Sequence, residues 1–192
     1  MPTESPAAPP PALETIRSFI NTGDLDTGEE HLADSRALAA WLAAHGLPVP
    51  GKAPTAAELQ RTVQLREALR ALAAQNAGEP ASHDALATLE RQRKRSRLGV
   101  VFGADGSAPI VPDASGIDAA LGELLAIVAS AMHDGTWRRL KACADPTCRW
   151  AFYDSSRSHR RAWCSMEVCG NRNKVRAYRN RQRADAPSDS GR

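Results

Sequence analysis

The sequence has no cysteine before Cys143 and none after Cys169. No apolar run approaches the roughly 20 residues that a helix needs to cross a bilayer, so no membrane span is predicted. The first twelve residues lack the basic start and the apolar stretch of a secretory signal, and we expect a cytoplasmic protein. Because disulfides belong to oxidising compartments, this expectation argues against pairing the cysteines with one another.

Groupings of catalytic residues are also missing. No Ser-His-Asp or Cys-His arrangement is suggested by any motif, and a zinc held by four cysteines has no open position for a substrate. The glycines at 99 and 103 are not followed by Lys-Ser/Thr and do not form a phosphate loop. We therefore expect no enzymatic activity. The five histidines are scattered without metal-ligand spacing: His31, His45, His83, His133 and His159.

The four cysteines fall in two matched pairs. Cys143 and Cys148 enclose four residues, Cys164 and Cys169 enclose four, and fifteen residues separate the pairs. Four thiolates match the tetrahedral coordination of one structural zinc ion. Two disulfides, four free thiols, or His159 in place of one cysteine are the alternatives. The spacing and the expected compartment favour zinc as the cofactor.

Charge divides the chain into two parts. Residues 1–136 contain 11 basic and 17 acidic residues, a net charge of −6, whereas residues 137–192 contain 14 and 5, a net charge of +9. A small metal-folded module with this excess of positive charge suggests a nucleic-acid partner. The acidic part could also fold back on the basic part and mask it.

The cysteine motifs resemble a known family. The pattern C-x4-C-x-W-x-F-x-D-x-S, followed by R-R-x-W-C-S-M-x-x-C-G-N-R-x-K, is similar to the CGNR zinc finger over about 40 residues. The segment before it resembles, more loosely, the helical ABATE domain through F-I-N-T-x-D and L-A-A-W-L. The resemblance implies a bacterial transcription regulator linked to stress, because proteins with both parts are generally described in this way.

Apolar residues at helical spacing predict that residues 13–136 form a helical domain, between a disordered tail at 1–12 and the finger at 137–183, with a second disordered tail at 184–192. We expect helices from residue 13, from 34 or 35, from 56 after a Thr55–Glu58 capping box, from 82, and from 117. A β-hairpin is expected near 98–111. The predicted fold class is thus α+β and mainly helical: a helical bundle with one hairpin, plus a small treble-clef-like zinc module.

Within the module, Trp150 to Phe152 predict a short strand, with Ala162–Trp163 as its partner. Asn171 is expected to cap the final helix, after a Gly170 whose backbone geometry a side chain would forbid. Val175 and Tyr178 are expected to seat this helix on the module. Few large apolar side chains are present, so zinc should supply the folding free energy.

Basic side chains on the final helix predict the functional surface. Arg172, Arg176, Arg179 and Arg183 recur every three or four residues and share one helix face, which suits phosphates or a guanine edge. The leading hypothesis is DNA binding by this module, with the helical domain sensing a signal or oligomerising; a homodimer and a small ligand are left open. RNA binding and a protein-interaction module with a purely structural zinc are the alternatives. The predicted nucleic-acid contacts are Arg157, Arg160, Arg161, Arg172, Lys174, Arg176, Arg179 and Arg183.

Overall fold

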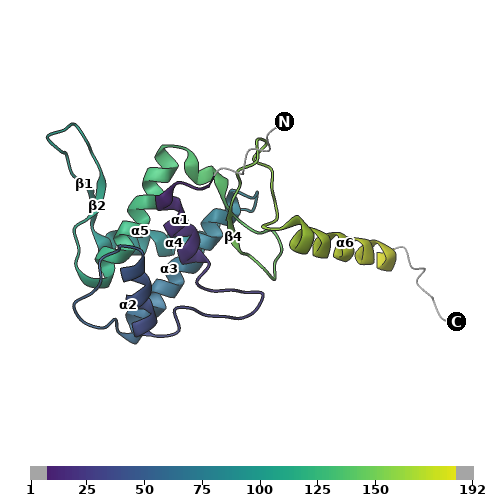
Figure 1. Ribbon diagram of the computed structural model, residues 1–192, viewed down its shortest axis with the longest axis horizontal. Helices are drawn as coiled ribbons and strands as arrows, with labels where there is room; N and C mark the ends of the chain where they lie inside the picture. The colour runs from purple at the N-terminus through teal and green to yellow at the C-terminus, as the bar shows by residue number, and fades with distance from the viewer. Residues whose placement is uncertain (1–7, 185–192) are drawn as a thin grey trace.

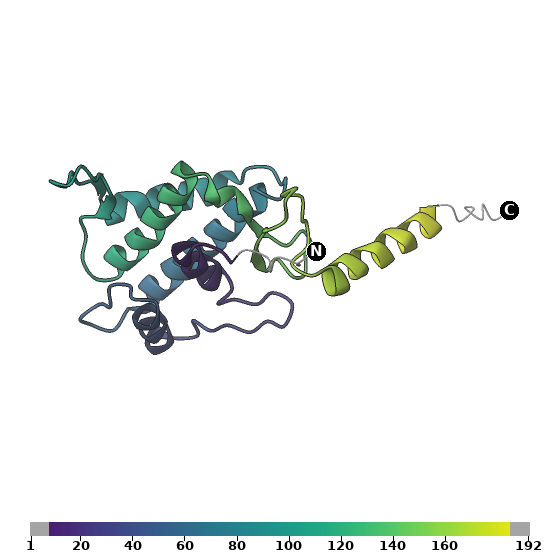
Figure 2. The same ribbon diagram turned by 45° about the horizontal axis from the view of Figure 1, so that its top comes forward.

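The computed structural model describes residues 8–184. Within that range it contains six α-helices and two antiparallel two-stranded sheets, the mainly helical α+β fold that the sequence predicts. Figures 1 and 2 show a helical body with a β-hairpin projecting at one end and a single helix projecting at the other. The first helix begins at Pro11, so it includes the last two residues of the predicted disordered tail; the rest of the predicted tails lies mainly outside the described residues.

Five helices build the body: α1 (Pro11–Ile20), α2 (Ser35–Ala44), α3 (Ala56–Gln75), α4 (His83–Ser96) and α5 (Gly116–His133). Side-chain caps explain where three of them begin. Asp34 accepts a hydrogen bond from the Ala37 amide, and Ser82 accepts one from the Ala85 amide. At the start of α3 the reciprocal Thr55–Glu58 capping box is present, as predicted.

The core lies around α5, which packs against α1, α4 and η1 (Thr136–Arg139). Leu121 and Leu124 on this helix, and Phe19 on α1, are completely buried. At 18 residues, α5 is also long and apolar enough to cross a membrane by length and composition, which the sequence analysis did not anticipate. Its position explains the composition, because a helix with neighbours on several sides needs an apolar surface on several sides.

The predicted hairpin is formed by β1 (Leu98–Val100) and β2 (Ile110–Pro112), paired with Val100 opposite Ile110. It lies close to α5 at Gly122. A Cβ at this position would approach Pro112 Cβ to 2.6 Å and Ser96 Cβ to 2.8 Å, so a larger residue would push the hairpin and α4 away from the core helix.

A second hairpin, of β3 (Leu140–Ala142) and β4 (Ala151–Tyr153), opens the four-cysteine segment. The prediction that Ala162–Trp163 would pair with the strand at 150–152 is wrong. That segment contributes only one backbone bond, from the Ala144 amide to the Ala162 carbonyl at 2.9 Å. The strands that flank the first cysteine pair are closer in sequence, and their pairing buries Leu140 and Ala151 completely in the core of the body.

The last two elements of the described residues are a short π-helix, η2 (Met166–Gly170), and α6 (Asn171–Ala184), which follows it directly. Ser165, not Asn171, caps this entry by accepting from the Val168 amide, and Asn171 already has helical backbone angles. Gly170 matters for space rather than for backbone angle: a Cβ there would lie 3.1 Å from the Met166 Sδ and Cε atoms.

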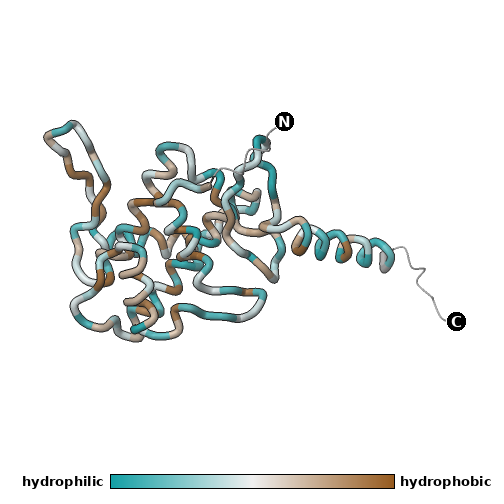
Figure 3. Tube along the Cα trace, in the orientation of Figure 1, coloured by the Kyte–Doolittle hydropathy of each residue, from teal (hydrophilic) through white to brown (hydrophobic). Residues whose placement is uncertain are grey.

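Helix α6 projects from the body, and its surface is mostly hydrophilic (Figure 3). Val175 and Tyr178 are 48% and 57% exposed, so the prediction that they seat the helix on the module is wrong. The reason is that the helix contacts the module mainly at its N-terminal end, through η2 and the side chains of Arg172 and Arg176.

Candidate metal centre and basic helix

The four cysteines converge on one point from four positions along the chain. Cys143 follows β3, Cys148 precedes β4, Cys164 follows a loop, and Cys169 lies in η2. Their Sγ atoms all lie within 4.8 Å of one another, with Cys148–Cys164 at 3.6 Å and Cys164–Cys169 at 3.7 Å. No pair is bonded as a disulfide. Sulfurs bound to zinc at 2.3 Å lie about 3.8 Å apart in a tetrahedron, which is close to the observed spacing.

The ionisation of these thiols requires a cation. Burial, followed by the neighbouring sulfurs, raises the pKa of Cys169 to about 12 and also raises the pKa of Cys164 well above its ordinary value. Thiols packed this closely lose their protons when a metal ion binds, because its positive charge stabilises the thiolates. This is the situation in a structural zinc site. The donor set, its burial and its geometry therefore all fit one Zn²⁺.

Asp145 shapes the turn that joins the first pair of cysteines. Its carbonyl accepts the amides of Cys148 and Arg149 at 3.0 and 3.1 Å, and its carboxylate accepts the Thr147 amide and hydroxyl. The side chain is completely buried. Burial raises the pKa of this carboxyl, but the Thr147 hydrogen bonds and the nearby Arg172 charge outweigh it, so the pKa is lowered overall. A buried anion is thereby kept next to the metal centre.

A buried ion pair closes the loop between the two pairs of cysteines. Lys141 Nζ lies 2.8 Å from Asp154 Oδ2 and also donates to the His159 carbonyl at 2.6 Å. Asp154 accepts further bonds from Ser156 and from the Arg161 amide. Burial raises the pKa of Asp154, yet the hydrogen bonds from Lys141 and Ser156 outweigh this and lower it to about 2.

Comparison with family models divides the chain at the start of β3. A model named ABATE, described as "Putative stress-induced transcription regulator", matches residues 13–138, and the CGNR zinc finger model matches residues 139–182. The chain belongs to the ABATE family. A search of curated proteins found no match. Together, the zinc-finger match and the four clustered sulfurs show that Cys143, Cys148, Cys164 and Cys169 hold one structural Zn²⁺.

The ABATE domain and the CGNR finger are joined by more than the chain. The Asn21 side chain donates to the Ala151 carbonyl at 2.9 Å and accepts the Ala151 amide at 2.7 Å, as a neighbouring strand would. Arg70, which is 3% exposed, bridges the carbonyls of Ile20 and Gly23 to that of Arg149. The F-I-N-T-x-D segment thus gains a physical role as the anchor of the finger's hairpin.

Sequence reasoning missed this anchor. Of its polar members, Arg70 lies within α3, and Asn21 and Asn76 directly follow α1 and α3, with nothing in their spacing to distinguish them from solvent-facing residues. Asn76 donates to the carbonyls of Trp137 and Leu140, both at 2.8 Å, and so fixes the connection between α5 and β3. The burial of Asn21 and Arg70, which requires partners for them, is known only from the folded structure.

The predicted nucleic-acid residues divide into bound and free side chains. Arg161 donates to the Cys164 carbonyl at 2.8 Å and lies over the Phe152 ring, so it supports the metal site. Arg176 reaches Asp145 at 3.4 Å. The side chain of Arg183 lies outside the described residues. Of the predicted nucleic-acid contacts, four are exposed and form no ion pair in the described part of the chain: Arg157, Arg160, Lys174 and Arg179.

Arg172 of the CGNR tetrapeptide is held by the ABATE domain. Both of its terminal nitrogens donate to the Asp26 carboxylate at 2.9 Å, and one also donates to Thr147 Oγ1 at 2.8 Å. The hydrogen bond from Arg172 lowers the pKa of Asp26. The acidic loop around Asp26 therefore neutralises the first arginine of the basic helix face.

Proposed function

We propose that this ABATE protein is a cytoplasmic, non-catalytic DNA-binding regulator that contacts DNA through α6. The observation that carries the proposal is the free-standing position of this helix (Figure 2). Its 14 residues extend for about 20 Å. A helix without neighbours along most of its length can enter the major groove of B-DNA, which is about 12 Å wide.

The charges on α6 support the same function. Arg172, Arg176 and Arg179 line a shallow hollow on the helix together with Asn171 and Asn180. Arginine suits phosphates and guanine, and asparagine suits adenine, so this face combines positioning groups with base-reading groups. The zinc centre would keep the first turn of the helix in a fixed orientation, since Asn173 Nδ2 donates to the carbonyl of the metal ligand Cys169 at 2.9 Å.

The four aromatic residues of the cysteine segment lend no support to the stacking of unpaired RNA bases, and Tyr178 on α6, which is 57% exposed, is the aromatic ring of this module that remains open to a base. Trp150 and Trp163 pack beside the cysteine cluster, Tyr153 packs against the main core, and Phe152 is only 7% exposed. Stacking of unpaired bases needs exposed aromatic faces. These rings are occupied by packing instead.

Replacing Arg176 and Arg179 with alanine should weaken binding to a random DNA duplex by about tenfold or more and reduce the slope of log K against log salt by about 1.8, because two phosphate contacts are lost. Fluorescence polarisation of the zinc-loaded protein across a salt series measures both quantities. The matched control, Arg93→Ala/Lys94→Ala, removes the same charge from the exposed face of α4. Absence of duplex binding by the wild type at low salt would refute the proposal, and preference for an RNA hairpin would reassign the partner.

Removing Asp26, one of the two carboxylates that pair with Arg172, should strengthen the same interaction; the other carboxylate is that of Asp145, 3.6 Å from Arg172 Nε. Asp26→Asn frees the Arg172 guanidinium for a phosphate, so the salt slope should steepen by about 0.9 and affinity at low salt should rise by about a few-fold. Glu29→Gln is the control, because it makes the same charge change in the same exposed loop without touching Arg172. Equal salt slopes for the two variants would show that Arg172 stays bound within the protein.

A further inference from the structure

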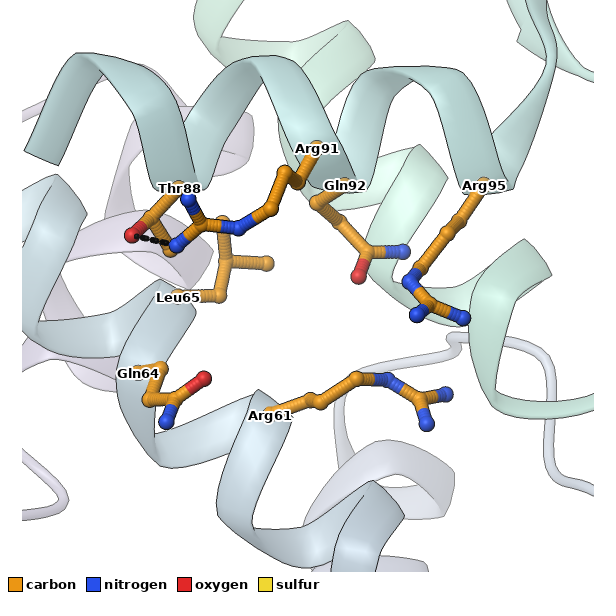
Figure 4. A pocket seen from close by; sticks show the side chains of 7 residues that line it. All are labelled: Arg61, Gln64, Leu65, Thr88, Arg91, Gln92 and Arg95. Atoms are coloured by element: carbon orange, nitrogen blue, oxygen red, sulfur yellow. Dashed lines mark hydrogen bonds between the residues drawn. The ribbon is translucent and has the colours of Figure 1, made fainter.

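A polar pocket lies between α3 and α4 of the ABATE domain, away from the zinc centre. Its volume is about 170 Å³, room for about five water molecules. Figure 4 shows the lining side chains arranged around an open space, with three arginines among them. The lining consists of Arg61, Gln64, Leu65, Thr88, Arg91, Gln92 and Arg95.

Positive charge in this pocket exceeds negative charge. Arg61 lies 3.3 Å from Asp118, the one carboxylate that pairs with the lining arginines among the described residues. Arg91 donates to the Thr88 hydroxyl at 2.8 Å, and neither it nor Arg95 forms an ion pair in the described part of the chain. Three guanidinium groups against one carboxylate leave two positive charges uncompensated.

The pocket also contains hydrogen-bonding groups that the fold leaves unused. Arg61 Nε is buried and has no hydrogen-bond partner among the described residues. Gln92 is 4% exposed, and its amide nitrogen is held by Ser96 at 3.0 Å and by Asp118 at 3.1 Å. This fixes the orientation of the amide, with its oxygen toward the open space (Figure 4). Buried polar groups normally have partners, so the Arg61 Nε atom indicates a ligand, and the Gln92 amide oxygen is available to it.

We propose that this pocket binds a small organic dianion, a phosphate monoester or a dicarboxylate, that also carries a hydroxyl group. The planar guanidinium forks of Arg61, Arg91 and Arg95 suit carboxylate and phosphate oxygens, and two uncompensated charges match a dianion. The Gln92 amide oxygen accepts the ligand hydroxyl. The volume of about 170 Å³ suits a ligand of a few carbon atoms. This site goes beyond DNA binding by α6, and its occupancy is measured without DNA.

Isothermal titration calorimetry on the full-length, zinc-loaded protein tests the proposal. Glycerol 3-phosphate and malate are the two dianion probes, and neutral glycerol is the ligand control. We expect saturable binding of at least one dianion with a Kd of about 1 mM or tighter, and no heat with glycerol. Saturation by glycerol 3-phosphate would identify a phosphate ester as the ligand class, and saturation by malate would identify a dicarboxylate.

Variants on α4 locate the site. Arg91→Gln/Arg95→Gln should weaken dianion binding by at least about tenfold, because two charged contacts are lost. Arg93→Gln/Lys94→Gln removes the same charge from side chains outside the pocket and should change the Kd by less than about twofold. All four positions are exposed, so the variants keep the fold.

Three results would overturn the proposal. Neither dianion saturates by about 10 mM, a concentration well above a millimolar Kd. Binding is the same in wild type and in Arg91→Gln/Arg95→Gln. Or neither dianion binds while the Arg91→Gln/Arg95→Gln variant loses affinity for duplex DNA, which would assign the pocket to nucleic-acid phosphates.

Discussion

Replacing Cys164 and Cys169 with serine should abolish zinc binding and unfold the chain from Trp163 through α6, while the ABATE domain stays folded. Structural zinc contributes about 10–16 kcal/mol in isolated finger peptides, more than any other single interaction in this segment can supply. Zinc content should fall from one ion per chain to none. Duplex DNA binding should be lost with it, because α6 would no longer be oriented.

The same variant makes a sharper prediction about the first half of the finger. Leu140, Ala142 and Ala151 are completely buried in the ABATE core, and Asn21 holds both backbone groups of Ala151. Hydrogen exchange should therefore show lost protection at residues 163–184 but retained protection at β3 and β4. Ser158→Ala, an exposed loop substitution, is the control. Loss of protection in β3 and β4 would mean that zinc, not the ABATE core, holds the hairpin.

Lys141→Met should destabilise the protein by about 3–5 kcal/mol, measured by urea unfolding. The substitution keeps the length of the side chain but leaves the Asp154 carboxylate, which is completely buried, without its ammonium partner. It also removes the donor to the His159 carbonyl, so the loop that carries Arg157 and Arg160 is no longer tied to β3.

A double-mutant cycle with Asp154→Asn isolates the pair. The double variant should lose clearly less free energy of unfolding than the two single variants lose in sum, because no uncompensated buried charge remains. Glu90→Gln, which breaks the exposed Arg93–Glu90 pair, should leave the free energy of unfolding nearly unchanged, because solvent screens this pair. Additive effects at Lys141 and Asp154 would show that the two charges do not stabilise one another.

The two halves of the molecule depend on each other through these contacts. The division between the family models falls at residue 138, directly before β3, yet β3 and β4 pack against the ABATE core. Arg149 of the finger also pairs with Glu79, just beyond α3. The finger thus contacts the ABATE domain through its hairpin and through Arg172 at the start of α6, and the rest of α6 projects from the body (Figure 1).

Local signals in the sequence were enough for the helices and for the metal ligands. The Thr55–Glu58 capping box and the apolar spacing of α5 act over a few residues, so they can be recognised without knowing the fold. The paired cysteines and the CGNR motif can also be recognised locally, because four cysteines in two C-x4-C pairs match the ligand set of a structural zinc site.

Tertiary structure decided which polar residues are engaged and which are free. Arg172 and Arg179 look equivalent on a helix face, but only Arg172 meets Asp26, a carboxylate 146 residues away. The partner of β4, the anchoring role of Asn21 and the charge excess around Arg61 also depend on segments that folding brings together. Pairing and burial are set by the whole packed chain, so no spacing within one segment could reveal them.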